Sequence, residues 1–204
     1  MSSVPTIASG IEIVPANCFE PLDFSAIYGR LAPLEVDLGC GDGSFLTAMA
    51  AENPGKNFLG VERLAGRVRS ACGKIERAGL ANARVIRFEI SYVVERLLPP
   101  NSITSFYLLF PDPWPKRRHA ARRIISENFL ALLHRALVPG GVVHVATDES
   151  GYFRQISRVA SASPGFIIVP NGGSILPASK FESRFLQRGV AIQRLELRKI
   201  SPVT

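Results

Sequence analysis

One short stretch of this 204-residue chain constrains its fold more than any other: an apolar segment that runs directly into three closely spaced glycines. Leu34–Leu38 predicts a buried strand, Gly39–Gly43 a glycine-rich loop, and Ser44–Ala51 a helix. Glycines allow the backbone to approach a ligand closely, and the N-terminus of the helix lies beside that ligand. The stretch therefore predicts a nucleotide-binding βα unit of an α/β protein.

Carboxylates occur where the predicted strands end. Asp37 lies just before the glycine loop, Glu62 follows the predicted strand Asn57–Val61 about twenty residues further on, and Glu89 follows the predicted strand Arg84–Phe88. These acidic side chains would repel a pyrophosphate, but they complement S-adenosylmethionine, which has a cationic sulfonium, an amino group and two ribose hydroxyls. The alternative is that each carboxylate only caps the next helix.

A fourth predicted strand ends in a stiff loop. Ile103–Phe110 is apolar and rich in aromatic and branched residues, which is typical of a buried strand. Prolines follow at positions 111, 113 and 115, and the strand cannot continue through them because proline has no N–H donor and a fixed φ. Asp112 and Trp114 are therefore expected on a loop at the carboxyl end of a strand, where open α/β sheets bind ligands.

A cluster of basic residues follows this loop. Five cations occupy the eight positions from 116 to 123, at Lys116, Arg117, Arg118, Arg122 and Arg123. Such a density of like charge is unfavourable unless an anion lies nearby, and the whole chain has a net charge of +7. A nucleic acid is the simplest polyanionic partner, and a solvated basic turn is the alternative. Trp114 is expected either to stack on a base or to pack under the loop.

The remaining segments continue the α/β pattern. Helices are expected over residues 92–98, from an N-cap at Ser126 to residue 137, and over 149–160, and strands over 142–146, 166–169 and 191–200. Residues 139–141 are expected to turn from the second helix into the strand that ends at Asp148. Residues 1–33 predict a lead-in arm with a short helix over 23–28, and residues 1–204 together predict a single domain.

Composition disfavours several classes of protein. Cys18, Cys40 and Cys72 lack the spacing of a disulfide framework or a zinc site. The histidines likewise show no ligand spacing, so no metal is expected; His134 is expected on a helix surface and His144 in a strand. No membrane span and no export leader is evident, so the cytoplasm is the expected location.

Five segments together resemble one known family. VDLGCGDGSFL, NFLGVE, FPDPWPKRRH, VPGG followed by ATD, and SKFESR occur in this order, and the chain is similar to the bacterial tRNA (guanine-N7)-methyltransferases from about Asp23 onward. The resemblance implies a Rossmann-like class I methyltransferase fold, with a seven-stranded, mostly parallel sheet and helices on both faces. It also implies S-adenosylmethionine as methyl donor and tRNA as substrate, methylated at N7 of the guanosine at position 46 in the variable loop.

The resemblance further implies roles for individual residues. Asp112 would be the catalytic residue, and cofactor contacts would come from Asp37, Gly39, Gly41, Glu62, Glu89 and Asp112. Substrate contacts would come from Lys116, Asp148, Ser179, Lys180, Phe181 and Glu182. The basic cluster adds expected contacts with RNA phosphates, from Arg117, Arg118, Arg122 and Arg123. A monomer or homodimer is expected, with no obligate protein partner.

The chain departs from the family pattern at several places. Glu89 stands where the family usually has Asp, and Ser179 where it usually has Thr. The usual Gln-Arg-Gly after Glu182 is displaced by the four residues 183–186. No Lys or Arg precedes Tyr28, so these residues are not expected to form the basic N-terminal clamp of related proteins.

Two other functions stay open from the sequence. One is a methyltransferase that acts on another RNA or on a small molecule, although the basic cluster argues against a small neutral substrate. The other is an RNA-binding module that retains the fold without transferring a methyl group. An NAD-dependent enzyme is disfavoured, because the loop lacks the G-x-G-x-x-G spacing and the neighbouring residues are acidic.

Overall fold

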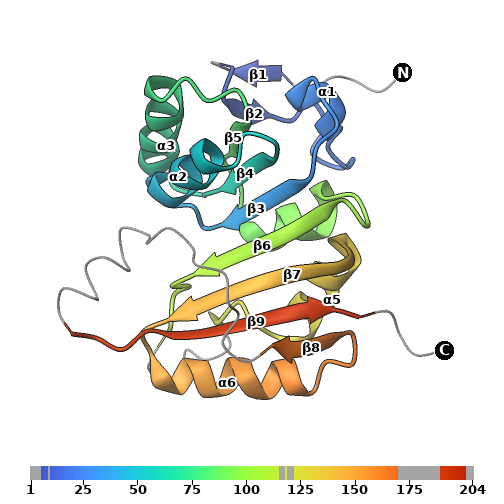
Figure 1. Ribbon diagram of the computed structural model, residues 1–204, viewed down its shortest axis with the longest axis vertical. Helices are drawn as coiled ribbons and strands as arrows, with labels where there is room; N and C mark the ends of the chain where they lie inside the picture. The colour runs from blue at the N-terminus through green and yellow to red at the C-terminus, as the bar shows by residue number, and fades with distance from the viewer. Residues whose placement is uncertain (1–5, 9, 115–117, 119–121, 170–188, 201–204) are drawn as a thin grey trace.

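The computed structural model describes residues 6–8, 10–114, 118, 122–169 and 189–200. Within these ranges nine strands form one sheet, in the order β1-β2-β5-β4-β3-β6-β7-β9-β8 (Figure 1). The strands are β1 (Thr6–Ala8), β2 (Glu12–Val14), β3 (Leu34–Leu38), β4 (Asn57–Val61), β5 (Ala83–Ile86), β6 (Ile103–Leu109), β7 (Leu137–Thr147), β8 (Phe166–Val169) and β9 (Gln193–Lys199). The pairs from β2 to β7 are parallel, whereas β1–β2, β7–β9 and β8–β9 are antiparallel, which confirms the predicted mostly parallel sheet.

The N-terminal segment extends the sheet beyond the seven expected strands. The sequence predicts only a lead-in arm there, but β2 pairs with β5, with Glu12 opposite Val85 and Ile13 opposite Ile86. The side chain of Ile13 is 1% exposed, so this segment contributes to the core. The short helix predicted over residues 23–28 is confirmed as α1 (Phe24–Tyr28).

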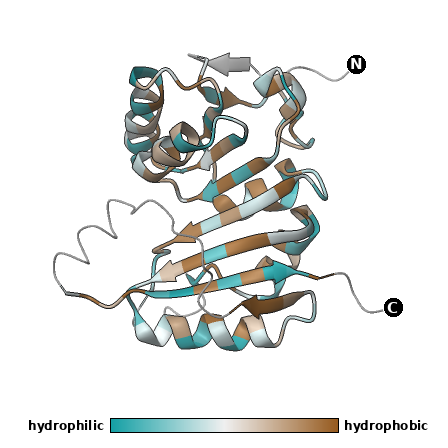
Figure 2. Ribbon diagram, in the orientation of Figure 1, coloured by the Kyte–Doolittle hydropathy of each residue, from teal (hydrophilic) through white to brown (hydrophobic). Residues whose placement is uncertain are grey.

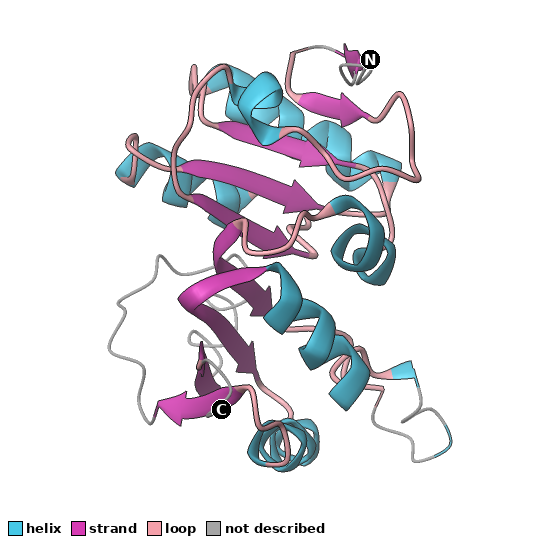
Figure 3. Ribbon diagram, turned by 90° about the vertical axis from the view of Figure 1, so that its right-hand side faces the viewer, coloured by secondary structure: helices cyan, strands magenta, loops and turns pink. Residues whose placement is uncertain are grey.

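Helices cover both faces of the sheet (Figure 3). Successive residues of β4 point to opposite faces, so Phe58 belongs to the buried cluster that includes α2 (Ser44–Glu52) and α3 (Ala65–Arg77), while Leu59 belongs to the larger cluster on the other face. α6 carries hydrophobic residues on one side and hydrophilic residues on the other (Figure 2), and it buries Tyr152, Ile156 and Ala160. These helices are α2 (Ser44–Glu52), α3 (Ala65–Arg77), the π-helix η1 (Val93–Leu97), α5 (Glu127–Ala136) and α6 (Ser150–Ser161).

Three local expectations from the sequence need correction. Instead of one helix over residues 92–98, the chain forms α4 (Ile90–Tyr92) followed by η1. β7 already begins at Leu137, so residues 139–141 lie inside the strand, where the register with β6 shifts between Ile103 and Ser105. A bulge absorbs the proline and glycines without ending the strand. α3 was not predicted from the sequence at all.

His134, expected on a helix surface, is half-buried, whereas His144 lies in a strand as expected. His134 Nε2 lies 3.2 Å from Ile200 O, and its ring packs edge-on against Phe166. His144 lies in β7 as expected, where its ring stacks on Tyr107 at 5.0 Å, and burial lowers its pKa. No group of His, Cys, Asp and Glu side chains suited to a metal ion occurs in the described part of the chain, and no described helix is long and apolar enough to cross a membrane.

The close approach of the glycine loop to α3 generates a first prediction. Gly43 has φ +75°, and a Cβ at this position would lie 2.6 Å from Ala71 Cβ. Gly43→Ala should therefore combine left-handed backbone strain with overpacking and destabilise the protein by about 2–5 kcal/mol. Urea unfolding of the purified variant measures this loss.

Gly140→Ala is a matched control, because Gly140 also has φ +75° but no atom lies within 4 Å of the position that a Cβ would occupy. Backbone strain alone should cost this variant about 1–2 kcal/mol. Equal losses in the two variants would show that the contact with Ala71 does not matter.

Candidate active site

A cavity of about 560 Å³ opens at the carboxyl ends of β3, β4 and β6. It is lined by residues from separate predicted motifs, among them Gly39, Glu62, Glu89, Asp112, Arg122 and Arg123. The structure therefore brings the glycine loop, two of the strand-end carboxylates and the proline-rich loop together at one edge of the sheet, where open α/β folds bind ligands.

The glycine loop is fixed from two sides. The N–H groups of Gly39 and Cys40 both donate to Val61 O, at 2.8 and 3.0 Å. On the other side, Lys74 Nζ of α3 lies 2.7 Å from Asp42 Oδ2 and donates to Ser44 Oγ. Gly39 has φ +87° and presents its backbone to the cavity, whereas Gly41 is buried and does not line it.

Asp37 and Glu62 form a buried acidic pair beside this loop. Each residue is only 5% exposed. Burial, together with the nearby negative charge of Glu62, raises the pKa of Asp37 to about 7. Glu62 lines the cavity, whereas Asp37 is not one of its lining residues. A positively charged ligand in the cavity would relieve the repulsion between these two carboxylates.

Glu62 and Glu89 also bind backbone N–H groups of the segments that follow them. Glu62 Oε1 accepts from Leu64 N–H at 2.9 Å, and Glu62 Oε2 lies 3.7 Å from Arg67 Nη1. Glu89 is exposed, and its Oε2 caps α4 by accepting from Tyr92 N–H at 2.9 Å. Capping and ligand contact are compatible here, because each carboxylate has a second oxygen and both residues line the cavity.

Asp112 lies on a segment of unusual backbone conformation, residues 110–114, which we term the Asp112 loop. Phe110 and Trp114 have φ of +55° and +40°, in the left-handed region that non-glycine residues rarely adopt. Phe110 N–H still pairs with Ala146 O at 2.8 Å, so the loop leaves β6 at a defined point. Asp112 itself is exposed while it lines the cavity, which makes its carboxylate available to a ligand.

The described arginines of the basic cluster occupy different environments. Arg118 and Arg122 are exposed, and Arg122 Cζ lies 5.0 Å from the centroid of the Trp114 ring. Trp114 is half-buried, so its ring packs within the loop on at least the side that Arg122 covers. Arg123 is directed into the protein, where its Nε donates to Pro113 O at 2.7 Å.

Several predicted site residues lie away from the cavity or beyond the described part of the chain. Asp148 is half-buried after β7 and does not line the cavity. The remaining predicted residues, Lys116, Arg117, Ser179, Lys180, Phe181 and Glu182, lie outside the described residues.

The apolar part of the cavity wall was not expected from the sequence. Phe88 and Ile90, on either side of Glu89, line it together with Leu108 of β6. The ring of Phe88 also stacks on Tyr92 at 5.6 Å. Their position in the sequence could have identified them, because Phe88 and Ile90 are the direct neighbours of Glu89, which was expected at the site. An apolar wall beside carboxylates suits a ligand with a flat ring and hydroxyl groups.

Comparisons with known proteins identify the family of the chain. A family model described as "Putative methyltransferase" matches residues 31–195. A protein of Syntrophotalea carbinolica named tRNA (guanine-N(7)-)-methyltransferase is 34% identical over 88% of this chain and 79% of its own length. Proteins with the same name from Nocardia farcinica and Bordetella parapertussis are 38% and 37% identical, over 89% and 88% of this chain and 72% of their own lengths.

Solved structures with a similar fold are more distant in sequence. The antibiotic-resistance methyltransferase Kmr has a TM-score of 0.64 at 18% identity, over 93% of this chain and 95% of that protein. A 30S ribosomal A1408 methyltransferase from an uncultured bacterium has a TM-score of 0.62 at 15% identity, over 92% and 96%. These structures confirm the class I methyltransferase fold, and the sequence matches place the chain in the tRNA (guanine-N7)-methyltransferase family.

Proposed function

We propose that this protein transfers a methyl group from S-adenosylmethionine to N7 of a guanosine in tRNA, at position 46 of the variable loop. The observation that carries the proposal is the shared cavity, in which Gly39, Glu62 and Glu89 lie beside Asp112. The names of the related proteins support the choice of tRNA and of guanine N7. Arg122, which lines the cavity and is exposed, and the exposed Arg118 in the same basic cluster support a polyanionic substrate.

The lining of the cavity fits S-adenosylmethionine. The carboxylate of Glu62 can accept hydrogen bonds from ribose hydroxyls, and the apolar side chains of Phe88 and Ile90 can enclose an adenine ring. The backbone of Gly39 permits close approach of the amino acid part of the ligand. When bound, the cofactor supplies a methyl group on a cationic sulfonium, and the acidic pair Asp37 and Glu62 favours that charge.

The reaction requires no proton transfer to or from the reacting guanine N7. Guanine N7 has an in-plane lone pair and no proton, so the S–CH₃ bond can break as the N7–CH₃ bond forms, and the positive charge passes from sulfur to the guanine ring. Placement of the two reactants in line can lower such a barrier by roughly 7–11 kcal/mol. Orientation is therefore the main task of the residues around the cavity.

Asp112 is the residue suited to orient the guanine. An ionised carboxylate only accepts hydrogen bonds, so Asp112 can accept from N1–H and the 2-amino group of guanine. Both contacts lie on the edge of the base opposite N7. The base must first leave its stacked position in the tRNA, at a cost of a few kcal/mol that is lower in a loop than in a duplex.

Asp112→Asn tests this assignment. The substitution replaces one of the two acceptor oxygens by an NH₂ group that would face a donor of the guanine edge. We therefore expect the methylation rate of unmodified tRNA, measured at saturating S-adenosylmethionine, to fall roughly 10²-fold or more. Transfer of labelled methyl groups, followed by nucleoside analysis, measures the rate and identifies 7-methylguanosine as the product. A variant that methylates at the wild-type rate would exclude this role of Asp112.

The same assay separates the competing functions. Label in another nucleoside, or in an RNA other than tRNA, would favour a different RNA methyltransferase. Tight tRNA binding by the wild-type protein without any transfer would favour a binding module.

The raised pKa of Asp37 predicts that cofactor binding depends on pH. Ionised Asp37 attracts the positively charged cofactor, and its pKa is about 7 in the free protein. The dissociation constant for S-adenosylmethionine should therefore fall roughly tenfold between about pH 6 and pH 8. Calorimetric titration across this range measures the change. In Asp37→Asn this dependence should disappear, and its persistence there would assign the titration to another group.

Stability of the free protein provides an independent check. The folded chain holds the proton of Asp37 more tightly than the unfolded chain, where the pKa is near 3.8. The resulting stabilisation is present below about pH 4 and is lost as the pH rises through about 7. Asp37→Asn should accordingly raise the melting temperature more at pH 8 than at pH 5.

A further inference from the structure

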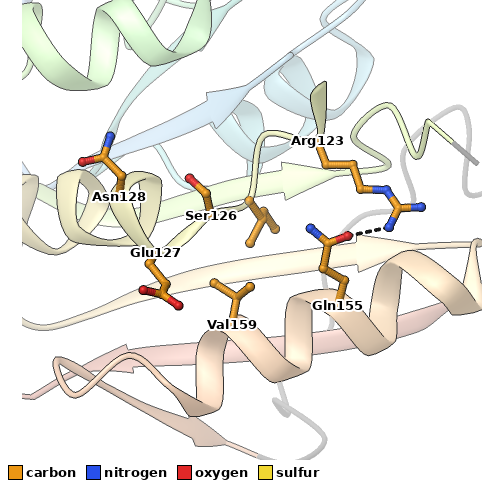
Figure 4. A pocket seen from close by; sticks show the side chains of 7 residues that line it. Arg123, Ser126, Glu127, Asn128, Gln155 and Val159 are labelled. Carbon is orange, nitrogen blue, oxygen red and sulfur yellow. Dashed lines mark hydrogen bonds between the residues drawn. The ribbon is translucent and has the colours of Figure 1, made fainter. Parts of the chain in front are cut away.

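Arg123 connects the Asp112 loop to α6. Its Nε donates to Pro113 O at 2.7 Å, its Nη1 to Gln155 Oε1 at 2.5 Å, and its Nη2 to Trp114 O at 3.4 Å. Figure 4 shows the side chain reaching over a second cavity, of about 430 Å³, toward Gln155. All three nitrogen atoms of the guanidinium therefore have acceptors within the protein.

The loop carbonyls that Arg123 binds lie on either side of Trp114. The carbonyl of Pro113 precedes the φ rotation of Trp114 and the carbonyl of Trp114 follows its ψ rotation, so holding both restricts this residue. Trp114 has φ +40°, a conformation that persists in a non-glycine residue only when its surroundings hold it. Arg123 supplies such a constraint, two residues away from Asp112.

The other end of the connection is firmly placed. Tyr152 of α6 is fully buried, and Arg123 Cζ lies 4.9 Å from the centroid of its ring. The Tyr152 hydroxyl accepts from Ile125 N–H at 3.4 Å. Glu149 caps the start of α6 by accepting from Gly151 N–H at 3.0 Å. Gln155 follows Tyr152 by three residues and so lies on the same side of the helix.

We infer that Arg123 is a positioning residue that fixes the Asp112 loop against α6, rather than a contact for RNA phosphates. The inference rests on the proposed function, because it concerns the loop that carries Asp112. The basic cluster had suggested that Arg123 contacts RNA phosphates. However, Arg123 is half-buried, and its three guanidinium nitrogens donate to Pro113, Trp114 and Gln155.

Substitution by lysine distinguishes the two roles. Lysine keeps the positive charge that a phosphate contact needs, but its single ammonium cannot span three separate acceptors. We expect Arg123→Lys and Arg123→Met to lower kcat by a similar factor, roughly 10- to 100-fold, with the dissociation constant of tRNA changed less than about twofold. Gln155→Leu should lower kcat in the same direction, and combining it with Arg123→Met should add little.

Binding of tRNA at several salt concentrations supplies the second readout. The slope of log affinity against log salt should be unchanged in Arg123→Met, whereas Arg122→Met should reduce it by about one. If instead Arg123→Lys retained the wild-type kcat and Arg123→Met reduced the salt slope by about one, Arg123 would be a phosphate contact and the inference would be wrong.

Fluorescence reports on the loop without any reaction. Trp114 is the one tryptophan of the chain. Arg123→Met and Gln155→Leu should raise the acrylamide quenching constant of Trp114 about twofold or more, while the folded far-UV spectrum stays unchanged. The matched control is Arg154→Met, an exposed arginine next to Gln155 on α6, which should leave the quenching constant unchanged. Unaltered quenching in Arg123→Met would refute the connection.

The two proposals fail in different ways. If the wild-type protein does not methylate tRNA but the variants still change Trp114 quenching, the proposed function is wrong and the connection between Arg123 and the loop stands. If the wild-type protein methylates tRNA and the variants change neither kcat nor quenching, only the role of Arg123 is wrong.

Discussion

The parallel pairing of β3 with β4 on one side and β6 on the other is the constraint on which the site depends. Asp37 lies opposite Gly60 of β4 and Tyr107 of β6, so all three strands end at the same edge. Gly60 has no side chain, and a Cβ there would lie 2.7 Å from Cys40 Sγ, because the glycine loop folds closely over β4. A shift of register by one residue would turn Asp37 to the opposite face of the sheet and remove this fit.

Charges of both signs meet at the site. The acidic side chains of Asp37 and Glu62 are buried, whereas Arg122, which lines the cavity, and Arg118 are exposed. The buried pair is unfavourable in the free protein, as the raised pKa of Asp37 indicates. A cationic cofactor near the buried carboxylates and an anionic RNA near the exposed arginines would each meet the charge that complements it.

The Asp112 loop is restrained by means other than regular hydrogen bonding. Prolines limit its φ angles, Phe110 N–H pairs with the neighbouring strand, and Arg123 binds two of its carbonyls. Two residues in the left-handed region are strained, and such strain persists where tertiary contacts outweigh it. A loop held in this way can keep a carboxylate in place for a substrate that arrives as part of a large RNA.

The sequence by itself indicated strands at the positions of β3 to β9, the glycine loop, and the carboxylates near the strand ends, because apolar runs, glycines and prolines act locally. Some bounds differ, since β5 ends at Ile86 rather than at residue 88 and β7 begins at Leu137 rather than at residue 142. The sequence could not determine that Glu62 lines the cavity and Asp37 does not, or that residues 139–141 lie inside β7 at a shift of register, because these depend on neighbouring strands. The sequence also could not predict that Arg122 and Arg123 have different environments. Adjacent arginines look alike in sequence, and only the packing of the Asp112 loop against α6 turned one outward and the other onto backbone carbonyls.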